Sequence, residues 1–358
     1  MEDVIPEYVE AVCNEIRIVG QADKRIEVHT IFFGGGTPSL LSPSQLEEIL
    51  RTISNVFEVK PGIEISLETN PGTLEPKYLR ELFEIGFNRI SIGVQSANNK
   101  ELILLGRIHT YEDAIRSVSY ARKAGFKNLN VDLIYGLPEQ TIADWQNTLR
   151  LMLGLDPEHI SLYGLTVEGD TQMGRWVNRG LLPLPDPDLA ADMYEWAGDE
   201  LATEGYEHYE LSNWAKPGYQ CRHNLRYWRN QSYLGFGAGA HGYAEYMRVA
   251  NISKIKLYIK HFNKLFSQKF PMSPTTIHFQ TIDVCTEMQE TMMLGLRLTK
   301  EGVSKYRFQE RFGKEMRDVF ECEINELTHL GLLEWAGDSL RLTTRGILVG
   351  NQVFMRFV

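Results

Sequence analysis

The stretch TIFFGGGTPSLLSPSQLEEIL, from Thr30 to Leu50, carries the signals that decide the fold. An apolar, β-branched run leads into three consecutive glycines, and a segment with helical periodicity follows them. Ser42 precedes Pro43 and has Gln45 three residues later, which is the pattern of a capping box with proline at the first helical position. The stretch therefore predicts a strand, a glycine turn and a helix, the repeating unit of α/β proteins.

The same strand, turn and helix recur through the first half of the chain. Thr110 with Asp113, and Thr141 with Asp144, repeat the helix-start signal before two further helical segments. The predicted strands are 28–33, 63–68, 89–94, 129–134 and 160–165. Alternating strands and helices indicate a parallel sheet covered by helices, and both a doubly wound sheet and a β/α barrel satisfy this pattern.

The composition changes after the proline-rich segment LLPLPDPD. We expect a barrel-type domain over residues 1–180, a connecting region over 181–280 and a small winged-helix-like domain over 281–358. The last domain is expected to hold three helices and a two-stranded wing that turns near Gly337. Its predicted helices are 284–298, 304–312 and 315–331.

Composition and charge narrow the class of protein. The 358 residues are 43% hydrophobic and 23% charged, with a net charge of −10. No apolar run reaches the length of about eighteen residues that a membrane span needs, and no secretory signal is visible, so a cytoplasmic protein is expected. Residues 281–358 hold 10 basic and 12 acidic residues, which makes nucleic acid a poor partner.

Glycines and polar residues stand at the carboxyl ends of the predicted strands, where parallel α/β folds bind ligands. They are Gly34, Gly35, Gly36 and Thr37, then Glu68, Gln95 and Asp132. Each has a structural explanation by itself: a tight turn, a helix cap, a solvated amide or a satisfied buried acid. Together they favour one pocket, to which Arg107 and His109 add positive charge.

This set of groups suits a nucleoside that carries an amino-acid tail. Glycine lets backbone groups approach a zwitterion closely, carboxylates and amides suit ribose hydroxyls or an ammonium, and arginine suits a ligand carboxylate. The triple glycine matches neither the dinucleotide-binding fingerprint nor the P-loop. An ordinary dinucleotide or triphosphate site is therefore less expected.

Five stretches, in order, carry a family resemblance: GGGTPSLL, LETNPGTL, RISIGVQS, VDLIYGLPEQT and YLGFGAGAH. They resemble the oxygen-independent coproporphyrinogen III oxidase family of radical S-adenosylmethionine (SAM) enzymes. CRHNLRYW resembles the H-N-x-x-Y-W signature of the branch of that family described as heme chaperones. The resemblance implies an α/β fold with a partial (β/α)₆ barrel. It also implies a SAM site made by Gly34, Gly35, Gly36, Thr37, Glu68, Gln95, Arg107 and Asp132.

A possible heme ligand lies in the same signature. His223 is followed by Tyr227 and Trp228, so it is either a ligand beside aromatic walls or a histidine that caps a turn. Cys221 ranks second as a ligand. The glycines of GFGAGAHG, residues 235–242, indicate either a close approach to a ligand or a tightly packed loop.

One family motif is absent. The C-x-x-x-C-x-x-C ligands of a [4Fe–4S] cluster do not occur, and the four cysteines, Cys13, Cys221, Cys285 and Cys322, are widely spaced. The segment EDVIPEYVEAVCNEI resembles the helix after the cluster loop. We expect truncation that removes the first barrel strand, with a cluster-free relative as the alternative. A [4Fe–4S] cluster is then expected only in a full-length form, and no radical chemistry from the chain as written.

Three functions follow from these observations. The leading one is a heme chaperone that binds heme and SAM and passes heme to an acceptor protein. The second is oxidative decarboxylation of coproporphyrinogen III, and the third is a cluster-free SAM-binding protein. Heme affinity and porphyrinogen turnover separate the first two, and SAM binding without any dependence on heme marks the third.

Overall fold

The computed structural model describes residues 4–21, 26–262 and 270–358. The chain forms two compact units. We call them the central unit, Phe32–Leu40 with Ile65–Cys221, and the terminal unit, Met1–Ile31 with Leu41–Glu64 and Arg222–Val358. All the candidate SAM residues belong to the central unit, whereas His223 belongs to the terminal unit.

One seven-stranded sheet includes the strands of the central unit, and the first parts of its first two strands, residues 27–31 and 58–64, belong to the terminal unit. Its strands are β1 (Glu27–Phe33), β2 (Glu58–Thr69), β3 (Arg89–Gln95), β4 (Leu129–Tyr135), β5 (His159–Gly164), β6 (Glu207–Glu210) and β7 (Asn213–Ala215), in the order β1-β2-β3-β4-β5-β7-β6. Strands β2 to β5 pair in parallel, and β7 and β6 continue the sheet in antiparallel pairs. The α/β class and the partial barrel are confirmed, and the five predicted strands match β1 to β5.

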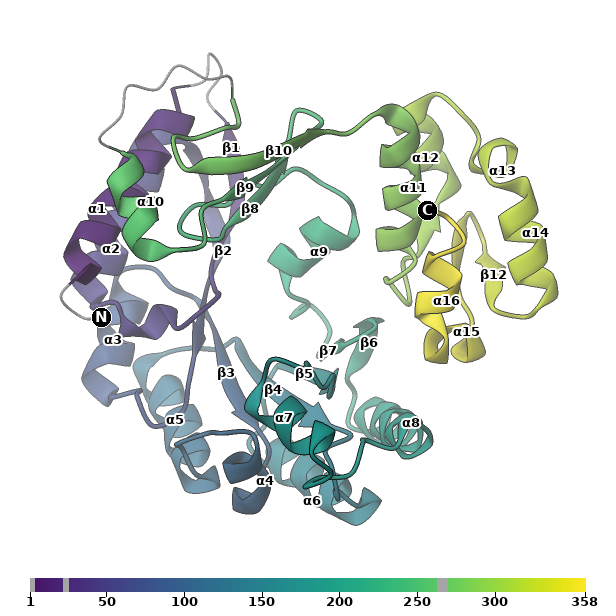
Figure 1. The fold of residues 1–358 in the computed structure, drawn as a ribbon, viewed down its shortest axis with the longest axis horizontal. Coiled ribbons are helices and arrows are strands. Elements are labelled where there is room, and N and C mark those ends of the chain that lie inside the picture. The colour runs from purple at the N-terminus through teal and green to yellow at the C-terminus, as the bar shows by residue number, and fades with distance from the viewer. Residues whose placement is uncertain (1–3, 22–25, 263–269) are drawn as a thin grey trace. The chain divides into compact units, whose positions relative to one another are not determined.

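Six α-helices belong to the described part of the central unit. They are α3 (Pro76–Glu84), α4 (Asn99–Leu104), α5 (Tyr111–Ala124), α6 (Ile142–Leu153), α7 (Gln172–Asn178) and α8 (Pro187–Thr203). Figure 1 shows α3, α5 and α6 along the outside of β3 and β4. Both predicted capping boxes of this unit are present, because Thr110 and Thr141 each exchange hydrogen bonds with the aspartate three residues on. Local sequence thus fixes where these helices begin.

The terminal unit begins with a helical pair. Helix α1 (Ile5–Val19) packs against α2 (Pro43–Val56), and α2 starts with the predicted capping box of Ser42 and Gln45. A three-stranded antiparallel sheet, in the order β10-β9-β8, lies in the same unit. Its strands are β8 (His241–Ala244), β9 (Met247–Asn251) and β10 (Thr276–Thr281), and the nearby helices are α9 (Arg222–Trp228) and α10 (Ile255–His261). The sequence did not predict this sheet.

The last part of the chain holds short helices and a three-stranded sheet. The helices are α11 (Val284–Gly295), α12 (Lys305–Phe312), α13 (Met316–Val319), α14 (Glu321–His329), α15 (Thr344–Leu348) and α16 (Gly350–Phe354), and the strands are β11 (Val303–Ser304), β12 (Leu333–Ala336) and β13 (Ser339–Leu342). The wing turns at Gly337, as predicted. The single helix predicted over 315–331 is wrong, because Phe320 leaves the helical conformation and packs its ring against Phe308 and Phe357.

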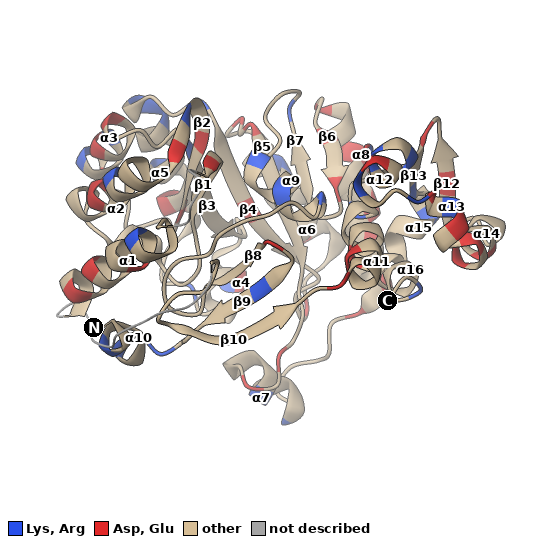
Figure 2. Ribbon diagram, turned by 90° about the horizontal axis from the view of Figure 1, so that it is seen from above, with Lys and Arg blue, Asp and Glu red and all other residues tan. Residues whose placement is uncertain are grey.

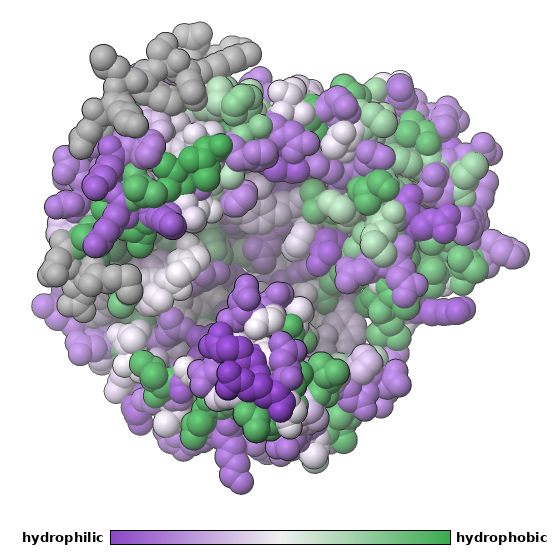
Figure 3. All heavy atoms as spheres, in the orientation of Figure 1, coloured by the Kyte–Doolittle hydropathy of each residue, from purple (hydrophilic) through white to green (hydrophobic). Residues whose placement is uncertain are grey.

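Charged and apolar side chains are mixed on the surface. Figure 2 shows acidic and basic residues interleaved along α11 to α14. Hydrophobic and hydrophilic side chains are interspersed over the face shown in Figure 3. The exposed apolar residues of the central unit include Ile103 and Ile108. Among the described residues, no helix combines the length and apolar character that crossing a bilayer requires.

Candidate functional site

The triple glycine ends β1 for two separate reasons. At Gly34 a Cβ atom would lie 2.4 Å from the Phe32 ring and 3.0 Å from the Glu68 carboxylate, so a side chain has no room. Gly35 and Gly36 have open space around them, but their φ angles of 77° and 62° are left-handed. Gly34 is therefore required because a side chain has no room there, and Gly35 and Gly36 are required because their backbone is left-handed.

Glu68, at the end of β2, is joined to this turn. The Gly35 N–H donates to Glu68 Oε2 at 2.9 Å. Burial raises the pKa of the Glu68 carboxyl, the Gly35 hydrogen bond lowers it, and the negative charge of Asp132 raises it. The turn and two carboxylates from different strands therefore lie close enough to act on one another.

Asp132 is held from two sides. Ser91 Oγ donates to Asp132 Oδ2 at 2.8 Å, and Asn130 Nδ2 donates to Oδ1 at 2.8 Å. Sequence reasoning missed Ser91 and Asn130. The available signal was their polarity inside apolar strands, with Asn130 two residues before Asp132 and hence on the same face of β4.

Arg107 adds a cation to this group. Its guanidinium donates to Asn70 Oδ1 at 3.2 Å, burial lowers its pKa, and the nearby Asp132 carboxylate opposes that shift. Thr37 follows the glycines, and its carbonyl accepts the N–H of Leu40 at 3.1 Å. These contacts bring the glycine turn, Glu68, Asp132 and Arg107 to one edge of the sheet.

Gln95 and His109 differ in the features that they add to the candidate SAM site. Gln95, at the end of β3, has a φ of 72°, which is uncommon for a side-chain-bearing residue and is typical of functional sites. His109 is buried, its Nε2 lies 3.0 Å from the Val94 carbonyl, and burial lowers its pKa. A neutral, hydrogen-bonded imidazole does not supply the positive charge expected of His109, which leaves that role to Arg107.

His223, in the terminal unit, sits at the start of α9. The Glu64 carboxylate, which is buried, accepts the backbone N–H groups of Arg222 and His223, both at 3.0 Å, and so caps this short helix. His223 Nδ1 lies 2.9 Å from Thr30 Oγ1, and Nε2 lies 2.9 Å from the Tyr227 hydroxyl. Both ring nitrogens therefore contact oxygens of the chain.

The other aromatic residues of the signature have clear packing partners. The Tyr227 ring stands at 89° to the Tyr233 ring, with 4.7 Å between centroids. Trp228 lies under the Arg297 guanidinium at 4.7 Å, and Arg297 also contacts Phe354 at 5.3 Å. Tyr227 thus contacts the His223 ring, whereas Trp228 connects α9, through Arg297, with the C-terminal helices of the same unit.

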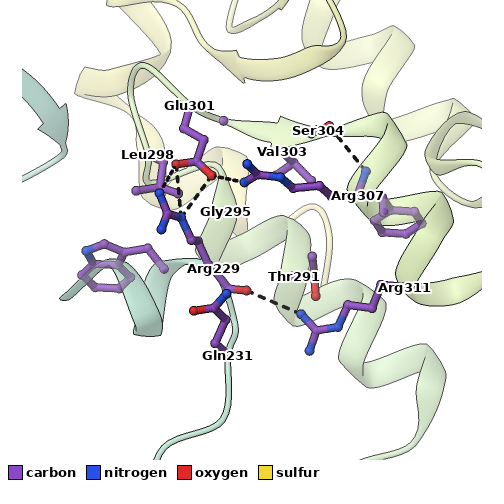
Figure 4. A pocket seen from close by; sticks show the side chains of 13 residues that line it. Arg229, Gln231, Thr291, Gly295, Leu298, Glu301, Val303, Ser304, Arg307 and Arg311 are labelled. Atoms are coloured by element: carbon purple, nitrogen blue, oxygen red, sulfur yellow. Dashed lines mark hydrogen bonds and ion pairs between the residues drawn. The ribbon is translucent and has the colours of Figure 1, made fainter. Parts of the chain in front are cut away.

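A cavity of about 200 Å³ adjoins Trp228 in the terminal unit (Figure 4). Glu301 accepts three hydrogen bonds from Arg229, with the shortest N–O distance 2.6 Å, and one from Arg307 at 2.5 Å. Arg311 pairs with Glu287 and donates to the Asn230 carbonyl at 2.8 Å. Each of these arginines is already paired with a glutamate of the chain. The ion pairs in the cavity wall therefore mainly connect the end of α9 with β11 and α12.

The glycine-rich loop before β8 is tightly packed. A Cβ at Gly235 would lie 1.9 Å from the His241 carbonyl oxygen, and a Cβ at Gly237 would lie 2.7 Å from the Tyr8 hydroxyl. The Gly237 N–H donates to the buried carboxylate of Glu15 at 2.8 Å. Of the two interpretations of these glycines, the packed loop is the one the contacts favour.

The cysteines do not form a cluster site. Cys13 and Cys221 are buried, and Cys285 and Cys322 are exposed. No three histidine, cysteine or acidic residues within 4–21, 26–262 and 270–358 are grouped as metal ligands. The four cysteines, all of which lie among the described residues, therefore do not offer the converging thiolates that a [4Fe–4S] cluster needs.

Comparison with known proteins agrees with the geometry. Residues 6–152 match the Radical SAM superfamily, and residues 284–349 match the HemN C-terminal domain. The heme chaperone HemW of Bacillus subtilis (strain 168) is 39% identical over 99% of this chain and 92% of its own length. The heme chaperone HemW of Lactococcus lactis subsp. lactis (strain IL1403) is 37% identical, over 99% and 90%.

A solved structure shares the fold. Coproporphyrinogen III oxidase (HemN) from Escherichia coli, a radical SAM enzyme, matches with a TM-score of 0.84 at 22% sequence identity. The match covers 100% of this chain and 84% of that chain. At this identity the likeness shows a common fold.

Proposed function

The chain belongs to the heme chaperone HemW family of radical SAM proteins, and we propose that it binds heme and SAM and transfers heme to an acceptor protein. The observation that carries the heme part is the setting of His223. Its imidazole lies between two hydroxyls, Thr30 Oγ1 and the Tyr227 phenol, at 2.9 Å each.

The two hydroxyls have different parts in the proposal. Metal-bound histidines generally donate their second ring N–H to an oxygen, which fixes the ring and the tautomer. In the proposed tautomer Thr30 Oγ1 accepts the hydrogen of Nδ1, so that Nε2 would be the nitrogen whose lone pair binds iron. The Tyr227 hydroxyl holds the same lone pair in the heme-free chain, so it must move aside for binding and can return when heme leaves. This competition suits a protein that releases its cargo.

The chemistry of residues in the central unit supports the SAM part of the proposal. Gly34 to Thr37 would meet its methionine end, the carboxylates of Glu68 and Asp132 would take its ammonium or ribose hydroxyls, and Arg107 would take its carboxylate. Gln95 completes the proposed set. Bound SAM supplies a sulfonium joined to a nucleoside and an amino acid, and the chain's own residues bind and orient it.

Heme titration followed by Soret absorbance tests the heme part. The native chain should bind one heme saturably, and His223→Ala should lose that binding. Tyr227→Phe keeps the ring against Tyr233 but removes the competing hydrogen bond, worth about 0.5–1.5 kcal/mol, so heme should bind about 2- to 13-fold more tightly. His278→Ala, at an exposed histidine of β10, is the matched control and should bind as the native chain does.

The outcomes separate the candidate functions. Binding unchanged in His223→Ala would move the ligand elsewhere, with Cys221 the next to test. Absence of saturable heme binding, together with turnover of coproporphyrinogen III by a full-length form that carries the cluster ligands, would favour the oxidase. Binding of SAM without any binding of heme would favour the third candidate.

A further inference from the structure

A row of polar residues crosses the sheet of the central unit. By strand register Glu68 faces Ser91, Ser91 faces Asn130, and Asn130 faces His159. Ser91, Asn130 and His159 are buried. Asp132 lies two residues beyond Asn130 and so shares its face of β4. Buried polar side chains need partners, and here they find one another.

The Asn130 amide has one orientation that satisfies its neighbours. Its Nδ2 donates to Asp132 Oδ1 at 2.8 Å and to Ser91 Oγ at 2.7 Å, and Ser91 in turn donates to Asp132 Oδ2. An amide turned by half a revolution would set its oxygen against the carboxylate. The Asn130 oxygen therefore faces the other way, toward β5.

This orientation fixes the proton of His159. Asn130 Oδ1 is an acceptor, so His159 Nδ1, at 2.6 Å, must carry the hydrogen. Complete burial lowers the pKa of His159 well below its usual range, so the imidazole is neutral and Nε2 accepts. The Tyr209 hydroxyl, at 2.8 Å, donates to Nε2, and its oxygen accepts the Cys221 N–H at 3.3 Å.

Every hydrogen in this chain of contacts points toward Asp132. We propose that His159 and Asn130 are positioning residues for the ligand site, in which the Nδ1-protonated imidazole sets the Asn130 amide and that amide sets the Asp132 carboxylate. The proposal rests on the proposed SAM site and adds to it residues that do not touch the ligand. The remaining lone pairs of Asp132 stay directed at a donor on the ligand.

Two substitutions at one position test the proposal. An asparagine places its amide near the former Nδ1, so His159→Asn keeps a donor for Asn130. A glutamine places its amide near the former Nε2, so His159→Gln removes the shorter donor to Asn130 Oδ1 and leaves the Ser161 hydroxyl, at 3.1 Å. By isothermal titration calorimetry with SAM, His159→Gln should raise Kd about tenfold, as for a lost buried hydrogen bond, and His159→Asn by less than about threefold.

A double-mutant cycle separates positioning from a general structural role. In the Asp132→Asn background, His159→Gln should cause no further loss of SAM affinity, because its effect passes through Asp132. An equal loss in both backgrounds, or equal losses for the asparagine and glutamine variants, would overturn the proposal. A native chain that does not bind SAM would overturn both this proposal and the SAM part of the proposed function.

The tautomer gives a readout that needs no variant to fold. In ¹⁵N-histidine-labelled native chain, NMR should show His159 protonated at Nδ1 and unprotonated at Nε2. Protonation at Nε2 would overturn the proposal even if the native chain binds SAM.

Discussion

Gly34→Ala places a methyl group where the structure has no room for one. The added Cβ would lie 3.0 Å from both Cδ and Oε2 of Glu68 and 2.4 Å from the Phe32 ring. The ring can rotate, but the carboxylate can yield only by moving away from the turn. That movement breaks the 2.9 Å hydrogen bond from the Gly35 N–H to Glu68.

The magnitude follows from that bond. A hydrogen bond to a charged group contributes about 1.5–3 kcal/mol. If Glu68 must return to its native position for SAM to bind, this free energy is lost from binding, and the Kd for SAM rises about 10- to 150-fold. Gly36→Ala is the matched comparison: its Cβ meets nothing within 4 Å, so its cost is the left-handed backbone, about 1–2 kcal/mol.

Calorimetric titration with SAM measures both variants, and urea unfolding shows whether either has lost its fold. The effect of Gly34→Ala should largely disappear in a Glu68→Ala background, which removes both the clashing carboxylate and its hydrogen bond, whereas that of Gly36→Ala should persist. Native affinity in Gly34→Ala, or an undiminished loss in the Glu68→Ala background, would contradict this prediction.

Three further predictions concern stability. The buried carboxylate of Glu15 accepts five hydrogen bonds, from Gly237 N–H and Tyr258 on one oxygen and from Asn251, Ser273 and Thr275 on the other. In urea melts Glu15→Gln should therefore lower the free energy of unfolding by about 1–3 kcal/mol, whereas Glu10→Gln, at an exposed position of the same helix, should leave it unchanged. Below pH 6.5 His159 takes up a proton in the unfolded chain but not in the native chain, because burial lowers its pKa. The free energy of unfolding should therefore fall by about 1.4 kcal/mol per pH unit from this group as the pH is lowered. In thermal melts His159→Asn should lose less stability over the same pH range. Glu301→Gln should cost about 1 kcal/mol at low salt and less at 1 M salt, since Arg229 and Arg307 lose a partly exposed partner; equal costs at both salt concentrations would contradict this.

Local signals in the sequence were enough to predict β1 to β5 and the starts of three helices, one of which, α2, belongs to the terminal unit. The capping boxes of Ser42, Thr110 and Thr141 and the apolar runs of β1 to β5 depend on residues a few positions apart. The motif order was also sufficient to indicate the family, which the relatives confirm. The helix over 315–331 was wrong because the break at Phe320 comes from the packing of its ring against distant residues.

Contacts between distant residues were beyond the sequence. Glu64, in a strand far earlier in the chain, caps α9. Thr30, in another early strand, lies within hydrogen-bond distance of the His223 ring. The row from Ser91 to His159 depends on strand register, which the hydrophobic pattern of strands buried on both faces does not fix. The roles proposed for Gly34 to Thr37, Glu68, Gln95, Arg107, Asp132 and His223 stay predictions.

Transfer of heme to an acceptor protein is the defining activity of a heme chaperone and can be measured directly. The native chain, loaded with one equivalent of heme, is mixed with excess apomyoglobin, and the Soret band reports the heme that moves. The account predicts complete transfer, with release slowed about 2- to 13-fold in Tyr227→Phe, because the hydroxyl that takes back the His223 lone pair is gone. Heme that stays on the native chain, or release at the same rate from the native chain and Tyr227→Phe, would contradict it.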